Sequence, residues 1–277
     1  MPPKAGRKKF IRQTTNSFNI DGSLNLFKHK TGKYMYTFER LSDEVHIATS
    51  AEHTFGTDAL LLSYFAKPKA RDIAIDMGTG CGIVPLLWLR NEFPKTVHCL
   101  DIQQNAYEQV KYSIENNGFE ERLIPHLGDL REIDKQFTAE TFTLVTMNPP
   151  YKPLNTGIES LGESARIARH EVCCNIEDAV KTAAYLLKYG GRFCMCHRPE
   201  RLVDAISLMR SYHLEPKRLR FVVDRAGEEP FLFLIEGKKN SNPFLRIEPT
   251  LSIKKENGKF TEEMLKVYGS FADGYDK

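Results

Sequence analysis

Short apolar runs alternate with amphipathic stretches through the middle of the chain. Each apolar run is five to seven residues long, rich in β-branched residues and closed by polar residues or glycine, which is typical of buried strands. The stretches between them carry apolar residues at helical spacing. The predicted strands cover residues 72–76, 96–102, 123–127, 142–147, 192–197, 217–223 and 231–236, and the predicted helices cover 59–66, 83–91, 105–116, 177–189 and 201–212.

This alternation predicts an α/β fold with a seven-stranded, mostly parallel sheet flanked by helices. Right-handed crossovers then bring the loops after the first four strands to one edge of the sheet. Local signals define several ends. Thr57 or Asp58 is expected to cap helix 59–66, Asn175 to cap helix 177–189, and Gly190-Gly191 to end it. Asn257-Gly258 predicts a hairpin turn, and Thr261 predicts the start of helix 262–268.

A glycine-rich turn follows the first strand of this alternation. The strand ends at Asp76, and glycines 78, 80 and 82 lead into the next helix. Glycine allows a tight turn and a close approach of the backbone to a ligand. The spacing differs from the dinucleotide pattern and lacks the lysine of a phosphate-binding loop, so it indicates S-adenosylmethionine as the ligand. A glycine turn that binds nothing is the alternative.

Two further acids close the next two strands. Asp101 ends the second strand, where a carboxylate is placed to accept hydrogen bonds from ribose hydroxyls, and Ile102 beside it is placed to pack on adenine. Asp129, before Leu130, is placed to accept from an adenine amino group. Helix capping or surface charge is the alternative for each acid. Their order and spacing together favour a binding site.

The fourth strand ends in Asn148-Pro149-Pro150-Tyr151. Two prolines prevent the chain from continuing as strand or helix, so the Asn side chain stays at the edge of the sheet. The Asn148 side-chain carbonyl and the Pro149 backbone carbonyl suit the two hydrogens of a planar amino group, and Tyr151 offers a face for stacking. Such contacts favour methylation of that nitrogen without a general base. A rigid loop that merely ends a strand is the alternative.

These motifs resemble class I S-adenosylmethionine-dependent methyltransferases of the amino-methylating branch, which have a Rossmann-like fold. Stretches around 54–62, 168–171, 197–201, 215–218 and 260–263 make residues 40–270 similar to the bacterial tRNA adenine N6-methyltransferases, which act next to the anticodon of a valine tRNA. The resemblance implies a catalytic set of Asn148, Pro149, Pro150 and Tyr151, and a cofactor-binding set of Asp76, Gly78, Thr79, Gly80, Gly82, Asp101, Ile102, Asp129, Leu130 and Asn148.

Composition fits one large domain with small extensions. The chain has 277 residues, of which 41% are hydrophobic, and a net charge of +3 that permits an acidic partner such as tRNA. We expect a basic extension over 1–40, a methyltransferase domain over 41–240, and a hairpin and short helix over 241–277 packed on that domain. Arg166, Arg169 and the cations of the first residues are candidates for RNA contacts, with solvated charge as the alternative, and His170 is expected to order its loop.

Six cysteines without a C-x-x-C pair, no apolar run long enough to span a membrane and no signal peptide together predict a reduced, cytoplasmic protein. Zinc-ligand spacing is missing, so no metal is expected, and 193–197 is expected to be a buried strand. Three other functions stay open: glutamine N5-methylation of a protein, a non-catalytic RNA-binding scaffold, and an NAD-dependent oxidoreductase. The intact Asn148 disfavours the scaffold, and the glycine spacing disfavours the oxidoreductase.

Overall fold

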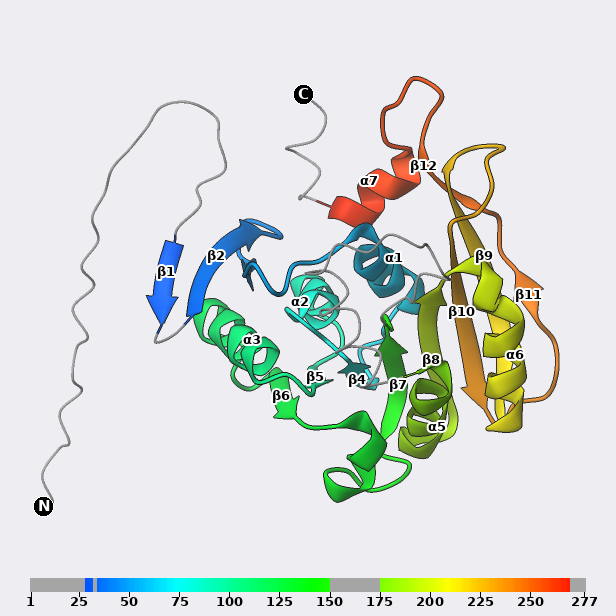
Figure 1. The fold of residues 1–277 in the computed structure, drawn as a ribbon, viewed down its shortest axis with the longest axis horizontal. Helices are drawn as coiled ribbons and strands as arrows, with labels where there is room; N and C mark the ends of the chain where they lie inside the picture. Colours follow the sequence, from blue (N-terminus) through cyan, green and yellow to red (C-terminus); the bar gives the residue numbers. More distant parts are fainter. Residues whose placement is uncertain (1–27, 32–33, 150–174, 270–277) are drawn as a thin grey trace, which may run out of the picture.

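One large mixed sheet forms the centre of the computed structural model, which describes residues 28–31, 34–149 and 175–269. Its strands run in the order β11-β9-β10-β8-β7-β4-β5-β6, and β12 pairs with β9 (Figure 1). These strands are β4 (Ile73–Met77), β5 (Thr96–Asp101), β6 (Leu123–Leu127), β7 (Phe142–Met147), β8 (Leu187–His197), β9 (Leu214–Arg225), β10 (Leu232–Lys239), β11 (Arg246–Ile247) and β12 (Leu251–Lys254).

Strands β6, β5, β4, β7 and β8 are parallel, and β10 is antiparallel to both β8 and β9. The reversal follows from the sequence, because β9 and β10 are joined directly, without a crossover helix. The predicted Rossmann-like, mostly parallel sheet of seven strands, β4 to β10, is therefore confirmed. The short strands β11 and β12 add to it, and both run parallel to β9.

Helices cover the two faces of the sheet and create two hydrophobic cores. On one face lie α1 (Thr57–Ala66), α2 (Ile83–Arg90), α3 (Gln104–Asn117) and α7 (Glu262–Tyr268), and on the other lie α5 (Ile176–Leu186), α6 (Leu202–Ser211) and the 3-10 helix η1 (Leu130–Lys135) (Figure 1). A second 3-10 turn, η2 (Pro199–Arg201), precedes α6. Trp88 of α2 is fully buried in the first core, and Phe193 of β8 in the second.

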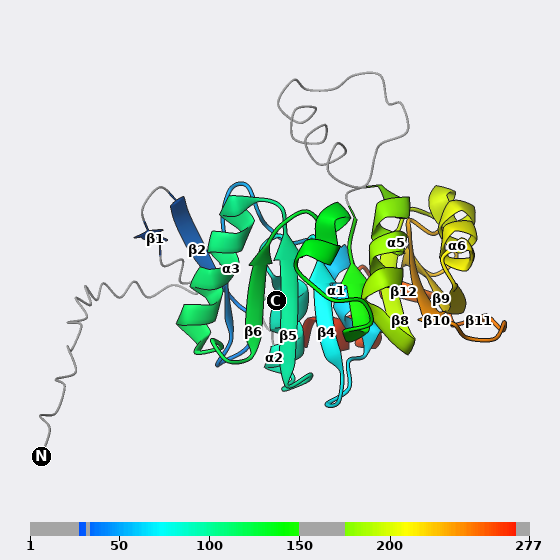
Figure 2. The same ribbon diagram turned by 90° about the horizontal axis from the view of Figure 1, so that it is seen from below.

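A separate antiparallel sheet precedes the domain. It consists of β1 (Lys28–Thr31), β2 (Tyr34–Arg40) and β3 (His46–Thr49), and it lies beside α3 (Figure 2). Asn117 of α3 exchanges two hydrogen bonds with the backbone of His46, and Ser113 accepts one from the amide of Ala48. The sequence predicts turns up to about residue 33 and a short strand or an irregular lead-in over 39–47, so it does not predict this sheet.

Several helix ends differ from the predictions. Helix α1 begins at Thr57, so its N-cap is Gly56, and neither Thr57 nor Asp58 serves as the cap. Helix α5 ends at Leu186, not at the glycine pair, because β8 begins at Leu187 and includes both glycines. Gly190 has φ of +73°, and a Cβ on Gly191 would lie 2.9 Å from the Lys188 carbonyl oxygen. The glycines therefore allow an irregular start to a strand.

Other local predictions are confirmed. Asn175 forms a capping box with Asp178 at the start of α5. Thr261 caps α7 through the amide of Met264, and Gly258, with φ of +81°, lies in the turn that brings Lys254 opposite Phe260. Helix α7 packs against α1 and β12.

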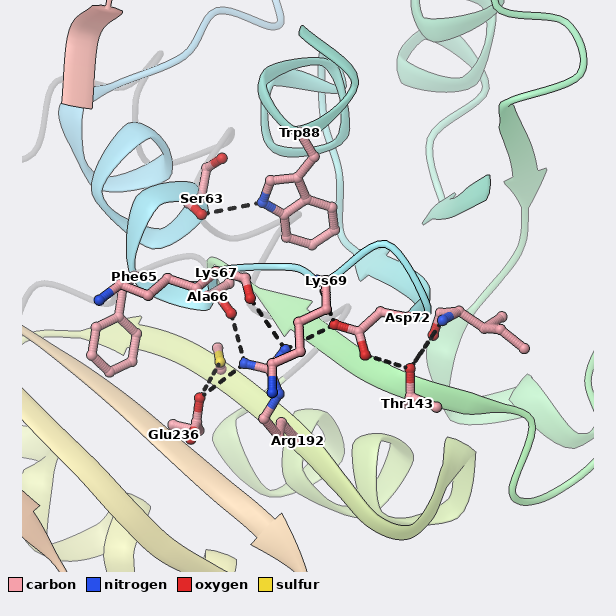
Figure 3. A network of polar contacts seen from close by, with 12 residues as sticks. Ser63, Phe65, Ala66, Lys67, Lys69, Asp72, Trp88, Thr143, Arg192 and Glu236 are labelled. Atoms are coloured by element: carbon pink, nitrogen blue, oxygen red, sulfur yellow. Dashed lines mark hydrogen bonds and ion pairs between the residues drawn. The ribbon is translucent and has the colours of Figure 1, made fainter. Parts of the chain in front are cut away.

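A buried ionic network joins the end of α1 to the sheet (Figure 3). The Arg192 guanidinium of β8 donates to the Ala66 carbonyl oxygen at 2.8 Å and pairs with Asp72 at 3.0 Å and Glu236 at 3.2 Å. Arg218 of β9 also pairs with Glu236, at 2.8 Å. Two cations thus share the Glu236 carboxylate of β10, and each also donates to a carbonyl in the last turn of α1, Arg192 to that of Ala66 and Arg218 to that of Phe65. The network fixes α1 against β4, β8 and β10.

Candidate functional site

The predicted site residues meet at the carboxyl edge of the parallel strands. Met77 of β4 is level with Leu100 of β5 and Met147 of β7, and Met147 is level with Met195 of β8. The residues one step further therefore form a row across the edge. This row consists of Asp101, Gly78, Asn148 and Cys196.

The glycine turn adopts a backbone that ordinary side chains rarely tolerate. Gly78, Gly80 and Gly82 have φ values of +63°, +55° and +81°. A Cβ on Gly80 would meet nothing within 4 Å, so the space above this glycine is open, whereas a Cβ on Gly82 would lie 3.0 Å from Val110 of α3. All three positions favour glycine because of their positive φ. In addition, the missing side chain leaves open space at Gly80 and allows close packing against α3 at Gly82.

Asp76 stabilises the glycine turn through side-chain hydrogen bonds. Its carboxylate accepts from the hydroxyl of Thr79 at 2.8 Å and from the hydroxyl of Thr146 at 2.6 Å. Burial raises the pKa of Asp76 to about 7, against the lowering effect of these two hydrogen bonds. The side chain is only 2% exposed, and Thr79 is buried with it. These contacts assign Asp76 and Thr79 a role in shaping the turn.

Asp101 links the turn to the end of β5. One carboxylate oxygen accepts from the Gly80 amide at 2.9 Å, and the other accepts from the Gln103 amide at 2.9 Å. Each carboxylate oxygen has a further lone pair, so the group retains capacity for two hydroxyls. Ile102, 40% exposed, presents an apolar surface directly beside it.

Asp129 lies after β6 as the N-cap of η1. Its carboxylate accepts from the Arg131 backbone amide at 2.9 Å and forms a two-pronged pair with the Arg131 guanidinium. These hydrogen bonds hold the pKa of Asp129 below its usual value. The sequence motifs do not predict Arg131 as the partner of Asp129. Leu130 is buried in the core between η1 and α5, so its side chain packs inward.

Asn148 follows the last residue of β7 and is half-buried, and Pro149 after it is buried. The Asn148 Oδ1 atom accepts a hydrogen bond from the Cys196 thiol, with Sγ and Oδ1 3.1 Å apart. Pro150 and Tyr151, which complete the predicted catalytic set, lie outside the described residues, as do Arg166, Arg169 and His170.

Two neighbours of the site were missed by sequence reasoning. Thr146 binds the buried Asp76 from the adjacent strand, and its position two residues before Asn148 was the available signal. Cys196 lies in the segment 193–197, which the sequence predicts only to be a buried strand. It is indeed buried, but it also contacts Asn148.

Metal ligands do not gather at this edge. Within residues 28–31, 34–149 and 175–269, the structure contains no group of three or more His, Cys, Asp or Glu side chains that could hold a metal ion. His197 instead accepts from the Arg198 amide through Nδ1 at 2.8 Å, and burial lowers its pKa to about 4.

No helix in the described part of the chain is long and apolar enough to cross a membrane.

A Rossmann-like sheet with an open glycine turn, an acid at the end of the second predicted strand and an Asn-Pro corner after the fourth defines a class I methyltransferase. The chain belongs to the methyltransferase small domain family, whose model matches residues 49–200. S-adenosylmethionine is its cofactor, and the residues fit that molecule: the space above Gly80 is open, Asp101 retains acceptor capacity, and Ile102 offers an apolar surface.

Curated relatives give a more specific comparison. The chain is 26% identical over 220 residues to the tRNA1(Val) (adenine(37)-N6)-methyltransferase of Christiangramia forsetii, with 78% of this chain and 89% of that protein covered. It is 25% identical over 246 residues to the protein of the same name from Porphyromonas gingivalis, with 86% and 94% covered.

Solved structures support the fold. A crystal structure described as a predicted O-methyltransferase from Agrobacterium tumefaciens matches with a TM-score of 0.60 at 21% identity, covering 77% of this chain and 96% of that one. Methanocaldococcus jannaschii Trm5 in complex with adenosine matches with a TM-score of 0.51 at 17% identity, covering 77% of this chain and 57% of that one.

Proposed function

We propose that this protein transfers a methyl group from S-adenosylmethionine to the N6 amino group of an adenine in tRNA, next to the anticodon of a valine tRNA. The observation that carries the proposal is the place of Asn148. Its amide oxygen lies at the carboxyl edge of the sheet, in the same row as Gly78 and Asp101. The names of the curated relatives support tRNA as the substrate and adenine as the base.

The proposed chemistry depends on two acceptors. An adenine amino group is a weak nucleophile because its lone pair is delocalised into the ring. Asn148 Oδ1 and the Pro149 carbonyl oxygen each accept one of its hydrogens, which localises the lone pair on nitrogen and orients it. Bound S-adenosylmethionine supplies an electrophilic methyl group. After transfer the nitrogen carries a positive charge and loses one proton to water, so no side chain is needed as a base.

The remaining residues of the predicted set have binding roles in this proposal. Asp101 accepts from the ribose hydroxyls, and Ile102 packs against the cofactor's adenine. Asp129 accepts from the adenine amino group, in place of one of the contacts that the Arg131 guanidinium makes with its carboxylate. Tyr151 stacks on the target base once that base has left its own stack. The glycine turn, held by Asp76, would give the cofactor a backbone surface without side chains.

A comparison of two substrate pools tests the proposal. Purified protein is incubated with methyl-labelled S-adenosylmethionine and either deproteinised unmodified tRNA or a protein fraction freed of RNA. We expect label in the tRNA only, and ribonuclease treatment should release it. Label in the protein fraction alone would support glutamine N5-methylation and reject the tRNA assignment.

A further inference from the structure

We propose that Cys196 is a positioning residue for Asn148: its thiol fixes the rotation of the Asn148 amide so that Oδ1 is held in place to receive a substrate N–H. The inference rests on the proposed function in assigning that oxygen to the substrate amine. The structure contains the contact between the two side chains, with Cys196 Sγ and Asn148 Oδ1 3.1 Å apart.

The sheet register creates this contact. Met147 and Met195 are partners in the parallel pair of β7 and β8, so the residues after them are level at the edge. Asn148 is half-buried there, whereas the Cys196 side chain is 0% exposed. The thiol therefore approaches the amide from inside the protein, where water does not compete for the same lone pair.

The direction of the hydrogen bond determines the orientation of the amide. A primary amide has an acceptor at one end and donors at the other, and a rotation of 180° exchanges them. A thiol donates to oxygen but is only a weak acceptor for N–H, so Cys196 favours the rotamer with Oδ1 toward β8. Under the proposed function, the same oxygen also receives a hydrogen from the substrate amine. The opposite rotamer would present NH2 to the substrate amine, donor against donor.

Cys194 provides a matched control. It lies two residues earlier on the same strand and face, is also 0% exposed, and belongs to the same hydrophobic core. Its thiol points to the Glu236 carboxylate, with Sγ and Oε2 3.7 Å apart, and not to Asn148. Replacing either cysteine with alanine removes one buried sulfur from the same core, but only one replacement removes the contact with Asn148.

Kinetics of three variants test the role. We expect Cys196→Ala to lower kcat about tenfold or more while the dissociation constant of S-adenosylmethionine stays within about twofold, because only the substrate amine loses alignment. Cys196→Ser keeps a donor and should recover kcat to within about threefold of the unchanged protein. Cys194→Ala should leave kcat nearly unchanged. A normal kcat in Cys196→Ala, or equal losses in the serine and alanine variants, would overturn the inference.

Side-chain NMR gives a readout that does not depend on activity. In protein labelled with 15N, the Asn148 amide protons are assigned by their disappearance in Asn148→Asp. We expect two resolved signals in the unchanged protein, Cys194→Ala and Cys196→Ser, and exchange-broadened or shifted signals in Cys196→Ala. Unchanged signals in Cys196→Ala would refute the positioning role. If the unchanged protein methylates no tRNA, the proposed function fails, whereas these spectra still decide the role of Cys196.

Discussion

At the scale of single residues, the proposed chemistry depends on a few polar groups at the ends of buried strands. Asp76 and Asp101 lie in the last two positions of β4 and β5, and Asn148 follows β7, so the sheet determines their positions more strongly than their own loops do. Their roles differ with their surroundings. Asp76 is enclosed by two threonine hydroxyls, whereas Asp101 binds backbone amides and keeps lone pairs for a ligand.

Asn148→Ala tests the proposed acceptor. We expect methylation to fall by at least about a hundredfold, because the variant removes the proposed acceptor for a hydrogen of the substrate amine. Cofactor affinity measured by calorimetry should stay nearly unchanged. Asn91→Ala at the far end of α2 serves as the control and should keep full activity. Full activity in Asn148→Ala would refute the assignment.

Asp101→Ala tests the cofactor side. We expect S-adenosylmethionine to bind about 1.5 to 3 kcal/mol more weakly, because charged hydrogen bonds to the ribose are lost. Calorimetry measures the change directly. Asp101→Asn keeps acceptor capacity toward Gly80 and should lose less affinity. If Asp101→Ala left the dissociation constant unchanged, the acid would have only the structural role of holding the turn.

At the scale of elements, the sequence predicts most strands and helices because burial imposes their periodicity. The ends are less predictable. The glycine pair at 190 and 191 predicts the end of a helix. In the structure, pairing with β7 extends β8 back to Leu187, so α5 ends earlier, at Leu186. The β1–β2–β3 sheet was not predicted because its β3 strand is held in place by hydrogen bonds to Asn117 and Ser113 of α3, which lie far away in the sequence.

The capping box of α5 gives a prediction at this scale. Asn175→Ala should lower the free energy of unfolding by about 1 kcal/mol, since it leaves the Asp178 amide without its side-chain acceptor. Chemical denaturation measures the change. Gln103→Ala provides the comparison, because Gln103 is the N-cap of α3 but makes no side-chain capping hydrogen bond. An equal loss in both variants would contradict the assigned role of Asn175.

At the scale of the whole molecule, a hydrophobic core lies on each face of the large sheet. The candidate site lies at the carboxyl edge of that sheet, where the ends of β5, β4, β7 and β8 are neighbours. The motifs predicted this convergence, since each occupies a loop at the same edge. They could not predict Arg131 beside Asp129 or Cys196 beside Asn148, because those contacts depend on the path of η1 and on the register of β7 and β8. Such contacts arise from packing, which residue spacing alone does not encode.

A histidine pair makes the stability of the molecule depend on pH. His98 and His126 lie with Nδ1 and Nε2 3.0 Å apart, and burial together with the charge of His126 lowers the pKa of His98 to about 4. Because the unfolded chain binds this proton near pH 6.5 and the folded chain only near pH 4, stability from this group is lost as the pH falls from about 6.5 to 4.

Denaturation curves across this pH range check the effect. His98→Asn should flatten the loss of stability on acidification relative to the unchanged protein. Asp76 acts in the opposite direction, since its pKa is raised to about 7 and its contribution is lost as the pH rises toward that value. The Asp76 contribution is common to both proteins and cancels in the comparison. Parallel curves for the two proteins would show that His98 carries no such linkage.

Mass spectrometry of nucleosides tests the central assignment most directly. Unmodified valine tRNA is incubated with the protein and S-adenosylmethionine that carries a deuterated methyl group, and the tRNA is then digested to nucleosides. The account predicts deuterated N6-methyladenosine, present with the unchanged protein and missing with Asn148→Ala. Label in any other nucleoside, or equal N6-methyladenosine from both proteins, would contradict it.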